Sequence, residues 1–470
     1  MGAQDVTSQR IIDEGGIDRA LEETQAPDSQ RLNDLLAKAR GLSGLTVGEA
    51  AELMLIEDRG HLDEMFETAR AIKQRIYGNR IVLFAPLYIS NECVANCLYC
   101  CFRRDNTALK RKTLDTGEIR AETRWLLEEG YRRLLLVFGD HPRIGVEQIM
   151  QAVEACYSVR VSERDDRIRR VNVNAAPLSR EDFEALKPAD IGTFQVFQET
   201  YHRETYERMH PSGPKADYDW RLNVWDRCLP AGIDDTGLGV LYGLYDWRWD
   251  TLALLQHSEY LMSRYRVGPH TISVPRLEPA QGSDYSTKSP WLVSDGDFKK
   301  LVAIVRMAVP YTGMILTTRE RPDFRRELME IGFSQVSAGS ITSPGGYTEQ
   351  GAKQDAGQFE VGDHRSLDQV MLNLCEQGYL PSFCTACYRS GRTGEQFMEL
   401  AKPGEIQTFC LPNALLSFKE YLLDHASPET VVEGERIIAA HLPQIESDAI
   451  RRRTEEKLRR TEEGERDLYI

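Results

Sequence analysis

The stretch Leu87-Tyr-Ile-Ser-Asn-Glu-Cys93-Val-Ala-Asn-Cys97-Leu-Tyr-Cys100 places three cysteines on one short segment after an apolar run. Their spacing is C-x3-C-x2-C, with Tyr99 directly before the third cysteine. Three thiolates on a tight loop suit a [4Fe–4S] cluster and leave its fourth iron open to a small molecule. Zinc is the alternative, but it normally takes four ligands, and the adjacent Cys101 would be an awkward fourth. The stretch therefore predicts an iron–sulfur cluster with one open iron.

Outward from this stretch, short apolar or β-branched runs alternate with helical patterns eight times. We predict strands at residues 81–90, 133–139, 170–176, 193–200, 236–244, 270–277, 314–319 and 334–341. Amphipathic helical candidates between them include 117–130, 146–159, 247–266 and 295–309. Such alternation predicts a parallel sheet, and eight repeats close it into a (β/α)8 TIM barrel of roughly 250 residues. The cysteines follow the first strand and so lie at the C-terminal mouth, where barrel enzymes perform their chemistry.

The chain divides into three predicted regions. Residues 1–80 form a polar arm followed by helices, and residues 81–342 form the barrel. The turn-rich segment Ser343-Pro344-Gly345-Gly346 then leads into a mostly helical region, 343–470, which has cysteines of its own. We expect this C-terminal region to bind an auxiliary cluster.

Composition narrows the class of protein. Ten unevenly clustered cysteines are typical of metal ligands in a reducing compartment rather than of disulfides. The chain lacks a signal-peptide pattern and any run of 18 apolar residues, so we expect a cytoplasmic protein without membrane contact. The net charge of −15 argues against nucleic acid as a partner.

The spacing of the first triplet, together with Tyr99, resembles the signature of the radical S-adenosylmethionine (SAM) superfamily. The resemblance implies that the open iron chelates the amino and carboxylate groups of SAM. The second strand in that superfamily usually ends in Gly-Gly-Glu, and here it ends in Phe138-Gly139-Asp140, for which an ordinary turn is the alternative. Because buried polar residues are costly unless paired or ligand-bound, we expect SAM or substrate contacts from further strand-end residues: Asn172, Asn174, Gln195, Gln198 and Glu199.

Cys384, Cys387 and Cys410 form a second triplet with the spacing C-x2-C-x22-C. Three ligands again fall short of a structural zinc site, so a second iron–sulfur cluster is the prediction. Zinc completed by a remote histidine or carboxylate is the alternative. The remaining cysteines have no partner at ligand spacing and are expected to be small buried hydrophobes: Cys101, Cys156, Cys228 and Cys375.

The signature, the barrel and the C-terminal triplet together resemble the HydG family of tyrosine lyases, which mature [FeFe]-hydrogenase, over about residues 42–424. The resemblance implies cleavage of the Cα–Cβ bond of L-tyrosine to p-cresol and dehydroglycine. It further implies conversion of dehydroglycine to CO and cyanide at a second cluster, possibly [4Fe–4S] with an extra labile iron. An electron donor and other hydrogenase maturation proteins are the implied partners.

Two other functions stay open. The barrel also resembles the thiamine-biosynthesis tyrosine lyases and the tryptophan lyases of peptide-antibiotic pathways, in which the second triplet is not a defining feature. A non-catalytic iron–sulfur scaffold is the alternative from another class.

The resemblance also suggests substrate and metal ligands. A zwitterionic amino acid needs a fixed cation for its carboxylate, and arginine suits that geometry. Arg319, at the end of the seventh strand, fits this role, with Ser337 and Ser340 as hydroxyl contacts; an ion pair of Arg319 with Glu320 is the alternative. His270 opens the sixth strand at the opposite mouth and is expected to hold the labile iron. A structural histidine is the alternative there, and His257 is the rival ligand.

Overall fold

The computed structural model describes residues 11–161, 166–349 and 357–470. Four helices precede the barrel, α1 (Glu14–Glu23), α2 (Ser29–Arg40), α3 (Val47–Met54) and α4 (Arg59–Tyr77). Each begins at a residue whose side chain accepts a hydrogen bond from the first turn, namely Asp13, Asp28, Thr46 and Asp58. Ile17 of α1 is fully buried, so this part of the expected arm packs onto the protein. The first ten residues of the arm lie outside the described residues.

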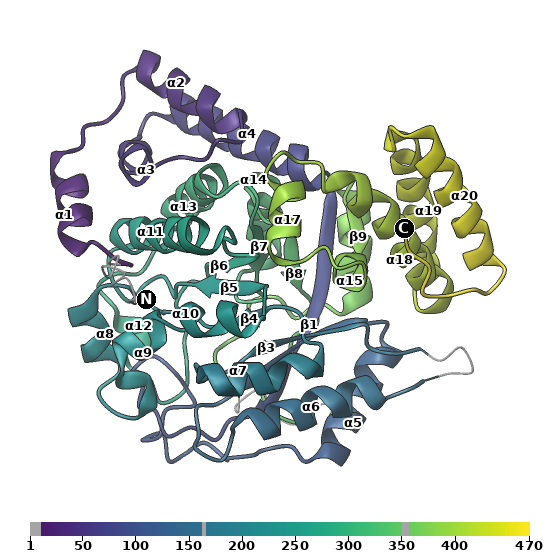
Figure 1. The fold of residues 1–470 in the computed structure, drawn as a ribbon, viewed down its shortest axis with the longest axis horizontal. Coiled ribbons are helices and arrows are strands. Elements are labelled where there is room, and N and C mark those ends of the chain that lie inside the picture. The colour runs from purple at the N-terminus through teal and green to yellow at the C-terminus, as the bar shows by residue number, and fades with distance from the viewer. Residues whose placement is uncertain (1–10, 162–165, 350–356) are drawn as a thin grey trace, which may run out of the picture.

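Eight parallel strands form a closed barrel (Figure 1), which confirms the predicted fold class. They are β1 (Arg80–Ser90), β2 (Arg133–Phe138), β3 (Arg170–Asn174), β4 (Phe194–Gln195), β5 (Thr236–Gly239), β6 (Thr271–Ser273), β7 (Gly313–Leu316) and β8 (Gln335–Ser337). Neighbours follow in chain order from β2 to β8, then β1, which pairs again with β2. The strands are almost entirely buried, as in other parallel sheets covered by helices.

Several strands are shorter than predicted, and the fourth shows why. Only Phe194 and Gln195 of the expected strand 193–200 belong to β4. Beyond Gln195 the chain keeps only isolated hydrogen bonds to the β5 segment, as far as Glu199, a non-glycine residue with a φ of 72°. Residues beyond the short strands therefore form the loops that line the barrel mouth.

Helices surround the barrel. Those between its strands are α5 (Thr116–Glu128), α6 (Val146–Ser158), α7 (Arg180–Leu186), α8 (Arg203–Met209), α9 (Tyr218–Leu222), α10 (Trp225–Cys228), α11 (Trp247–Tyr265), α12 (Tyr285–Lys288), α13 (Asp295–Ala308) and α14 (Pro322–Ile331). The C-terminal region adds α15 (Leu367–Glu376), α16 (Ala386–Arg389), α17 (Gly394–Ala401), α18 (Gln407–Asp424), α19 (Pro428–His441) and α20 (Asp448–Glu462). Among the described residues, no helix has both the length and the apolar character needed to cross a membrane.

A ninth strand, β9 (Leu380–Ser382), ties the C-terminal region to the barrel, and the sequence did not predict it. Val82 of β1 pairs with Gln335 of β8 on one edge and with Ser382 of β9 on the other. Strand β9 therefore lies on the same edge of β1 as β2 does, beside the first residues of β1. Because Cys384 comes two residues later, this pairing brings the second thiol triplet to the N-terminal end of the barrel.

Candidate functional site

The first cysteine triplet lies on the loop that follows β1, at the C-terminal mouth. The end of β2 fixes this loop, since the Gly139 amide donates to the Ser90 carbonyl (2.9 Å) and the Val94 amide to the Asp140 carbonyl (2.8 Å). A Cβ atom on Gly139 would lie only 2.2 Å from the carbonyl oxygen of Glu92. A side chain would separate strand and loop, so glycine is required at this close approach.

The three thiols of this loop need a cation to ionise. Cys97 is buried, Cys93 and Cys100 are partly buried, and all three line one cavity. Burial raises the pKa of Cys97 to about 11 and that of Cys100 to about 12. Thiolates here depend on a bound metal for stabilisation, which fits a cluster held by three cysteines.

In neither triplet do the three sulfurs lie as close together as the ligands of a single metal ion do. Four sulfurs around zinc lie roughly 3.8 Å apart, from Zn–S distances of about 2.3 Å in tetrahedral geometry. Among the described residues, three or more metal-binding atoms lie within 4.8 Å of one another only at Asp166, Asp424 and His425. Arg132 and Arg466 already pair with the two carboxylates of that group. In neither thiol triplet do all three sulfurs lie within 4.8 Å of one another.

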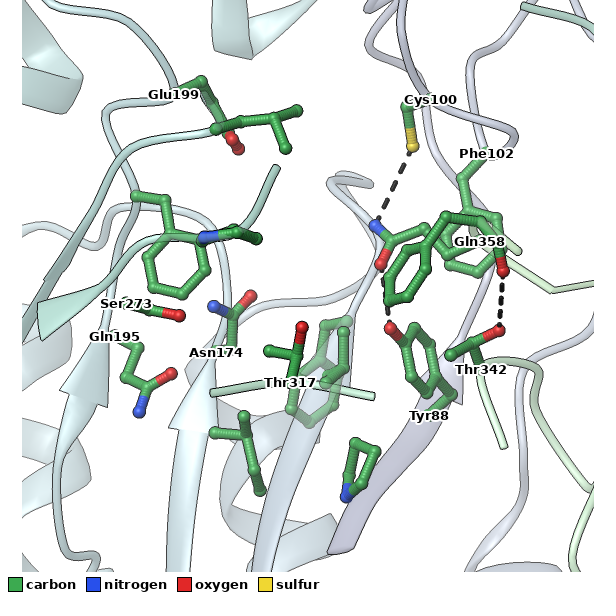
Figure 2. Close-up of a pocket in the computed structure, with 18 of the residues that line it drawn as sticks. Tyr88, Cys100, Phe102, Asn174, Gln195, Glu199, Ser273, Thr317, Thr342 and Gln358 are labelled. Atoms are coloured by element: carbon green, nitrogen blue, oxygen red, sulfur yellow. Dashed lines mark hydrogen bonds between the residues drawn. The ribbon is translucent and has the colours of Figure 1, made fainter. Parts of the chain in front are cut away.

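A cavity that opens to solvent lies beside the first triplet (Figure 2). Asn174, Gln195 and Ser273 face it from one side, and Tyr88 faces it from the other. Gln358 lies on the same side as Tyr88: its Nε2 is 3.8 Å from the sulfur of Cys100, and its Oε1 accepts a hydrogen bond from the Tyr88 hydroxyl (2.8 Å). Sequence reasoning missed Gln358, which lies in the Gly/Ser-rich connection after the barrel.

Two cations flank the carboxylate of Glu199 at the cavity wall. The Lys215 ammonium is 2.6 Å from Oε1 of Glu199, and Arg221 Nη2 is 4.0 Å from the same oxygen. All three residues line the cavity beside Cys97. The group therefore has one more positive than negative charge, which suits an anionic ligand group. Lys215 and Arg221 could not be predicted as site residues, because they follow α8 rather than a strand end.

The other predicted SAM contacts fall into two groups. Tyr99, Gly139, Asp140, Asn174 and Glu199 line the cavity. Asn172 and Gln198 do not: the Asn172 oxygen accepts a hydrogen bond from the Thr193 amide (3.0 Å), and Gln198 is buried outside the lining. The Tyr99 hydroxyl is 2.8 Å from Nε2 of His210, so this aromatic side chain is held in place.

Arg319 has no carboxylate partner among the described residues. The neighbouring Glu320 pairs instead with Arg276, whose Nε donates to Oε1 at 2.9 Å. The Arg319 guanidinium lies over the Phe359 ring, 3.4 Å from its centre, and lines the cavity. Burial lowers the pKa of Arg319 from its ordinary 12.5, and the group remains a cation at neutral pH.

Two hydroxyl groups line the cavity with Arg319. Ser337 Oγ accepts a hydrogen bond from the Thr318 amide (3.2 Å). Ser340 Oγ is buried and has no hydrogen-bond partner in the described structure. A buried hydroxyl without a partner is costly, so Ser340 is available to a ligand.

The second triplet gathers below the opposite end of the barrel. Cys384 follows β9, Cys387 lies on α16 and Cys410 on α18. A hydrogen bond between the Cys410 and Cys387 thiols lowers the pKa of Cys387 and raises that of Cys410. The thiols raise the pKa of the Arg80 guanidinium, and Arg133 Nη1 donates to the Cys384 carbonyl (2.7 Å). Thiols among cations suit a cluster of net negative charge.

His270 lies beside this second thiol site, whereas His257, the other candidate ligand of the labile iron, does not. Its Nε2 is 3.5 Å from the hydroxyl of Tyr388, the residue that follows Cys387. His257 lies on α11, where its Nδ1 is 2.9 Å from the Tyr201 hydroxyl. The remaining cysteines are completely buried, in agreement with their expected role as small core residues: Cys101, Cys156, Cys228 and Cys375.

Comparison with known proteins agrees with this geometry. Residues 87–255 match the Radical SAM superfamily model, and residues 273–380 match the Biotin and Thiamin Synthesis associated domain. The 2-iminoacetate synthase of Escherichia coli (strain K12) is 32% identical over 346 residues, or 73% of this chain and 88% of that protein.

Two crystal structures are similar over nearly the whole chain. One, of HydG, a maturase of the [FeFe]-hydrogenase, is 51% identical with a TM-score of 0.94 and covers 98% of this chain and 100% of its own. The other, the FeFe-hydrogenase maturase HydG from Carboxydothermus hydrogenoformans, is 38% identical with a TM-score of 0.81, covering 95% and 98%.

A parallel barrel with a cysteine triplet in its mouth, matched by these sequences, defines a radical SAM enzyme, which uses a [4Fe–4S] cluster and SAM. The HydG structures also include the C-terminal domain in their match. Within the radical SAM superfamily, the chain belongs to the HydG family.

Proposed function

We propose that this enzyme cleaves the Cα–Cβ bond of L-tyrosine to give p-cresol and dehydroglycine, and forms CO and cyanide from dehydroglycine for the [FeFe]-hydrogenase active site. One observation carries the proposal: two thiol triplets lie at opposite ends of one barrel. Cys93, Cys97 and Cys100 line the C-terminal mouth. Cys384 follows β9 at the N-terminal end.

At the mouth, Cys93, Cys97 and Cys100 would hold a [4Fe–4S] cluster, which when bound would supply the electron for reductive cleavage of SAM to methionine and a 5′-deoxyadenosyl radical. The protein positions the reactants. The pair of cations at Lys215 and Arg221 suits the carboxylate of SAM, while Glu199 suits a hydroxyl or ammonium donor.

Arg319 is the cation that would hold the tyrosine carboxylate. It is partly buried, lines the cavity and forms no ion pair in the described structure, so its charge is available to a ligand. The unpartnered hydroxyl of Ser340 lines the same cavity. Together they would fix the amino acid so that its amino group faces the radical, which is how a binding site increases the effective concentration of two reactants.

At the second site, Cys384, Cys387 and Cys410 would hold an auxiliary cluster and His270 an additional labile iron. His270 is buried, and its Nδ1 lies 3.4 Å from Oδ1 of Asp235, a carboxylate partner of the kind that orients a metal-binding histidine. An electron donor and other hydrogenase maturation proteins are the partners this function requires.

A tyrosine lyase that stops at dehydroglycine is the second candidate, favoured by the 32% identity to 2-iminoacetate synthase. The double variant Cys384→Ala with Cys387→Ala separates the two. We expect p-cresol formation to remain and CO formation to be lost, with Cys375→Ala, a buried cysteine of the same region, as the control. Persistent CO in the double variant would remove the second site from the mechanism.

A further inference from the structure

A short basic segment follows the first triplet. Residues 103–112, here called the basic loop, read Arg-Arg-Asp-Asn-Thr-Ala-Leu-Lys-Arg-Lys and contain five basic residues and one acidic residue. The chain as a whole has a net charge of −15. The basic loop therefore carries a net positive charge on a protein whose overall net charge is negative.

The basic loop folds back over the cysteines. The Arg103 amide donates to the Cys100 carbonyl (3.2 Å), and the Arg104 amide to the Ala95 carbonyl (2.9 Å). Nδ2 of Asn106 donates to the Cys101 carbonyl (2.8 Å). These bonds join the basic loop directly to the segment that carries the first cluster's ligands. The positive charge is therefore next to the redox centre.

Inside the loop, Arg111 acts as its scaffold. Its guanidinium donates to the carbonyls of Asn91 (2.8 Å), Phe102 (2.7 Å) and Arg103 (2.7 Å). Carbonyl oxygens satisfy these donors without cancelling the charge, because none of them is ionised. Arg111 thus adds a positive charge beneath the surface.

At the surface, part of the charge is not neutralised. The Arg104 side chain is 53% exposed and shares Asp105 (3.2 Å) with Arg103 (3.9 Å). Lys110 is exposed and has no ion-pair partner among the described residues. Only Lys112 is fully paired, with Glu349 (2.8 Å) and Glu118 (3.3 Å).

We propose that the basic loop is the docking surface for a small acidic electron-transfer protein that reduces the first cluster. The carrier gives up one electron and the cluster accepts it, with no bond made or broken. Complementary charge raises the rate of encounter, and weak redox complexes use small interfaces of this kind. The proposal rests on the radical SAM class of the enzyme and not on its substrate.

The test uses the reconstituted enzyme with reduced flavodoxin as the acidic carrier, and it follows the initial rate of 5′-deoxyadenosine formation from SAM. The variants are Lys110→Glu and its combination with Arg104→Glu. The matched control is Arg452→Glu with Arg453→Glu, the same change of charge on two exposed residues of α20, in the C-terminal region (Figure 1). Each variant is also assayed with dithionite, a small reductant that needs no docking surface.

We expect the loop double variant to lose at least tenfold of its flavodoxin-driven rate at low ionic strength and most of its salt dependence, while its dithionite-driven rate and iron content stay unchanged. Lys110→Glu alone should show a smaller loss of the same kind. Equal flavodoxin-driven rates in all variants would overturn the proposal. A parallel loss with dithionite would also overturn it, because the loop would then support the cluster rather than a partner.

Discussion

The carboxylate of Asp235 lies 3.4 Å from Nδ1 of His270, and both side chains are buried at the N-terminal end of the barrel. Asp235 Oδ1 also accepts a hydrogen bond from the Gly394 amide (3.3 Å), while Oδ2 has no partner in the described structure. A carboxylate in this position favours the proton on Nδ1. Nε2, on the side of Tyr388, then remains the coordinating nitrogen.

Asp235→Asn should therefore weaken the second site without affecting the first. We expect p-cresol formation to persist and the CO yield to fall by about tenfold or more, the usual effect of removing the partner of a metal-binding histidine. Iron bound per chain should fall as well, which gives a readout independent of activity. The control is Asp34→Asn, an exposed residue of α2. Unchanged iron and CO in Asp235→Asn would show that this carboxylate only supports the fold.

Replacing Arg319 should act on substrate binding. Because no acid in the described structure pairs with it, Arg319→Gln removes the charge available to a carboxylate. We expect the KM for tyrosine to rise about 10- to 100-fold, with a smaller rise in Arg319→Lys, which keeps the charge but loses the planar fork. SAM binding, measured by the change it causes in the EPR spectrum of the reduced cluster, should be unaffected. A normal KM in Arg319→Gln would assign the tyrosine carboxylate to another group.

Arg111→Gln should loosen the first cluster. Its guanidinium holds three carbonyls of the cysteine segment together, and glutamine cannot reach all of them. We expect the reconstituted variant to retain about half of the iron of the first cluster or less, and to lose it faster to a chelator. The control is Arg120→Gln on the exposed surface of α5. Equal chelation rates for both variants would contradict the scaffold role.

Asp250 should make stability depend on pH. Burial raises its pKa from 3.8 to about 7, while its Oδ1 accepts hydrogen bonds from Thr200 and the Tyr201 amide. Between these pKa values the folded protein holds a proton that the unfolded chain has released. The free energy of unfolding contributed by this group therefore falls as pH rises from about 4 to about 7 and is constant above that range.

Asp250→Asn should remove this contribution, because an uncharged amide still accepts both bonds. We expect the variant to be more stable than the parent protein at pH 8, by on the order of 2 kcal/mol, with little difference near pH 4. Urea unfolding at both pH values measures the effect, with Asp219→Asn on the exposed surface as the control. The same difference between variant and parent at both pH values would contradict the assigned titration.

The barrel was predictable because each strand and each helix has its own local sequence pattern. Eight strand–helix repeats in succession are typical of one closed parallel barrel. Strand β9 was not, since Leu380-Pro381-Ser382 has no strand pattern and forms a strand only because the first residues of β1 offer a free edge. That pairing determines where the second triplet lies.

The residues that line the cavity were also only partly predictable from the sequence. Asn172 and Asn174 share a face of β3, and alternation assigns them one role. They differ in depth by about 6–7 Å, two residues of strand rise, so Asn174 faces the cavity while Asn172 bonds to Thr193. Lys215 reaches Glu199 only because the chain after α8 turns back toward the mouth. Depth and return loops depend on tertiary packing, which spacing does not encode.

The proposed function is tested by product analysis after anaerobic reconstitution with iron and sulfide, in the presence of SAM, a reductant and L-tyrosine. p-Cresol and CO are measured together, and iron and labile sulfide are counted to verify that both sites are loaded. We expect both products from one enzyme. p-Cresol without CO from fully loaded protein would contradict the proposed role of Cys384, Cys387 and Cys410 and leave a lyase that stops at dehydroglycine, whereas intact SAM would contradict the enzyme itself.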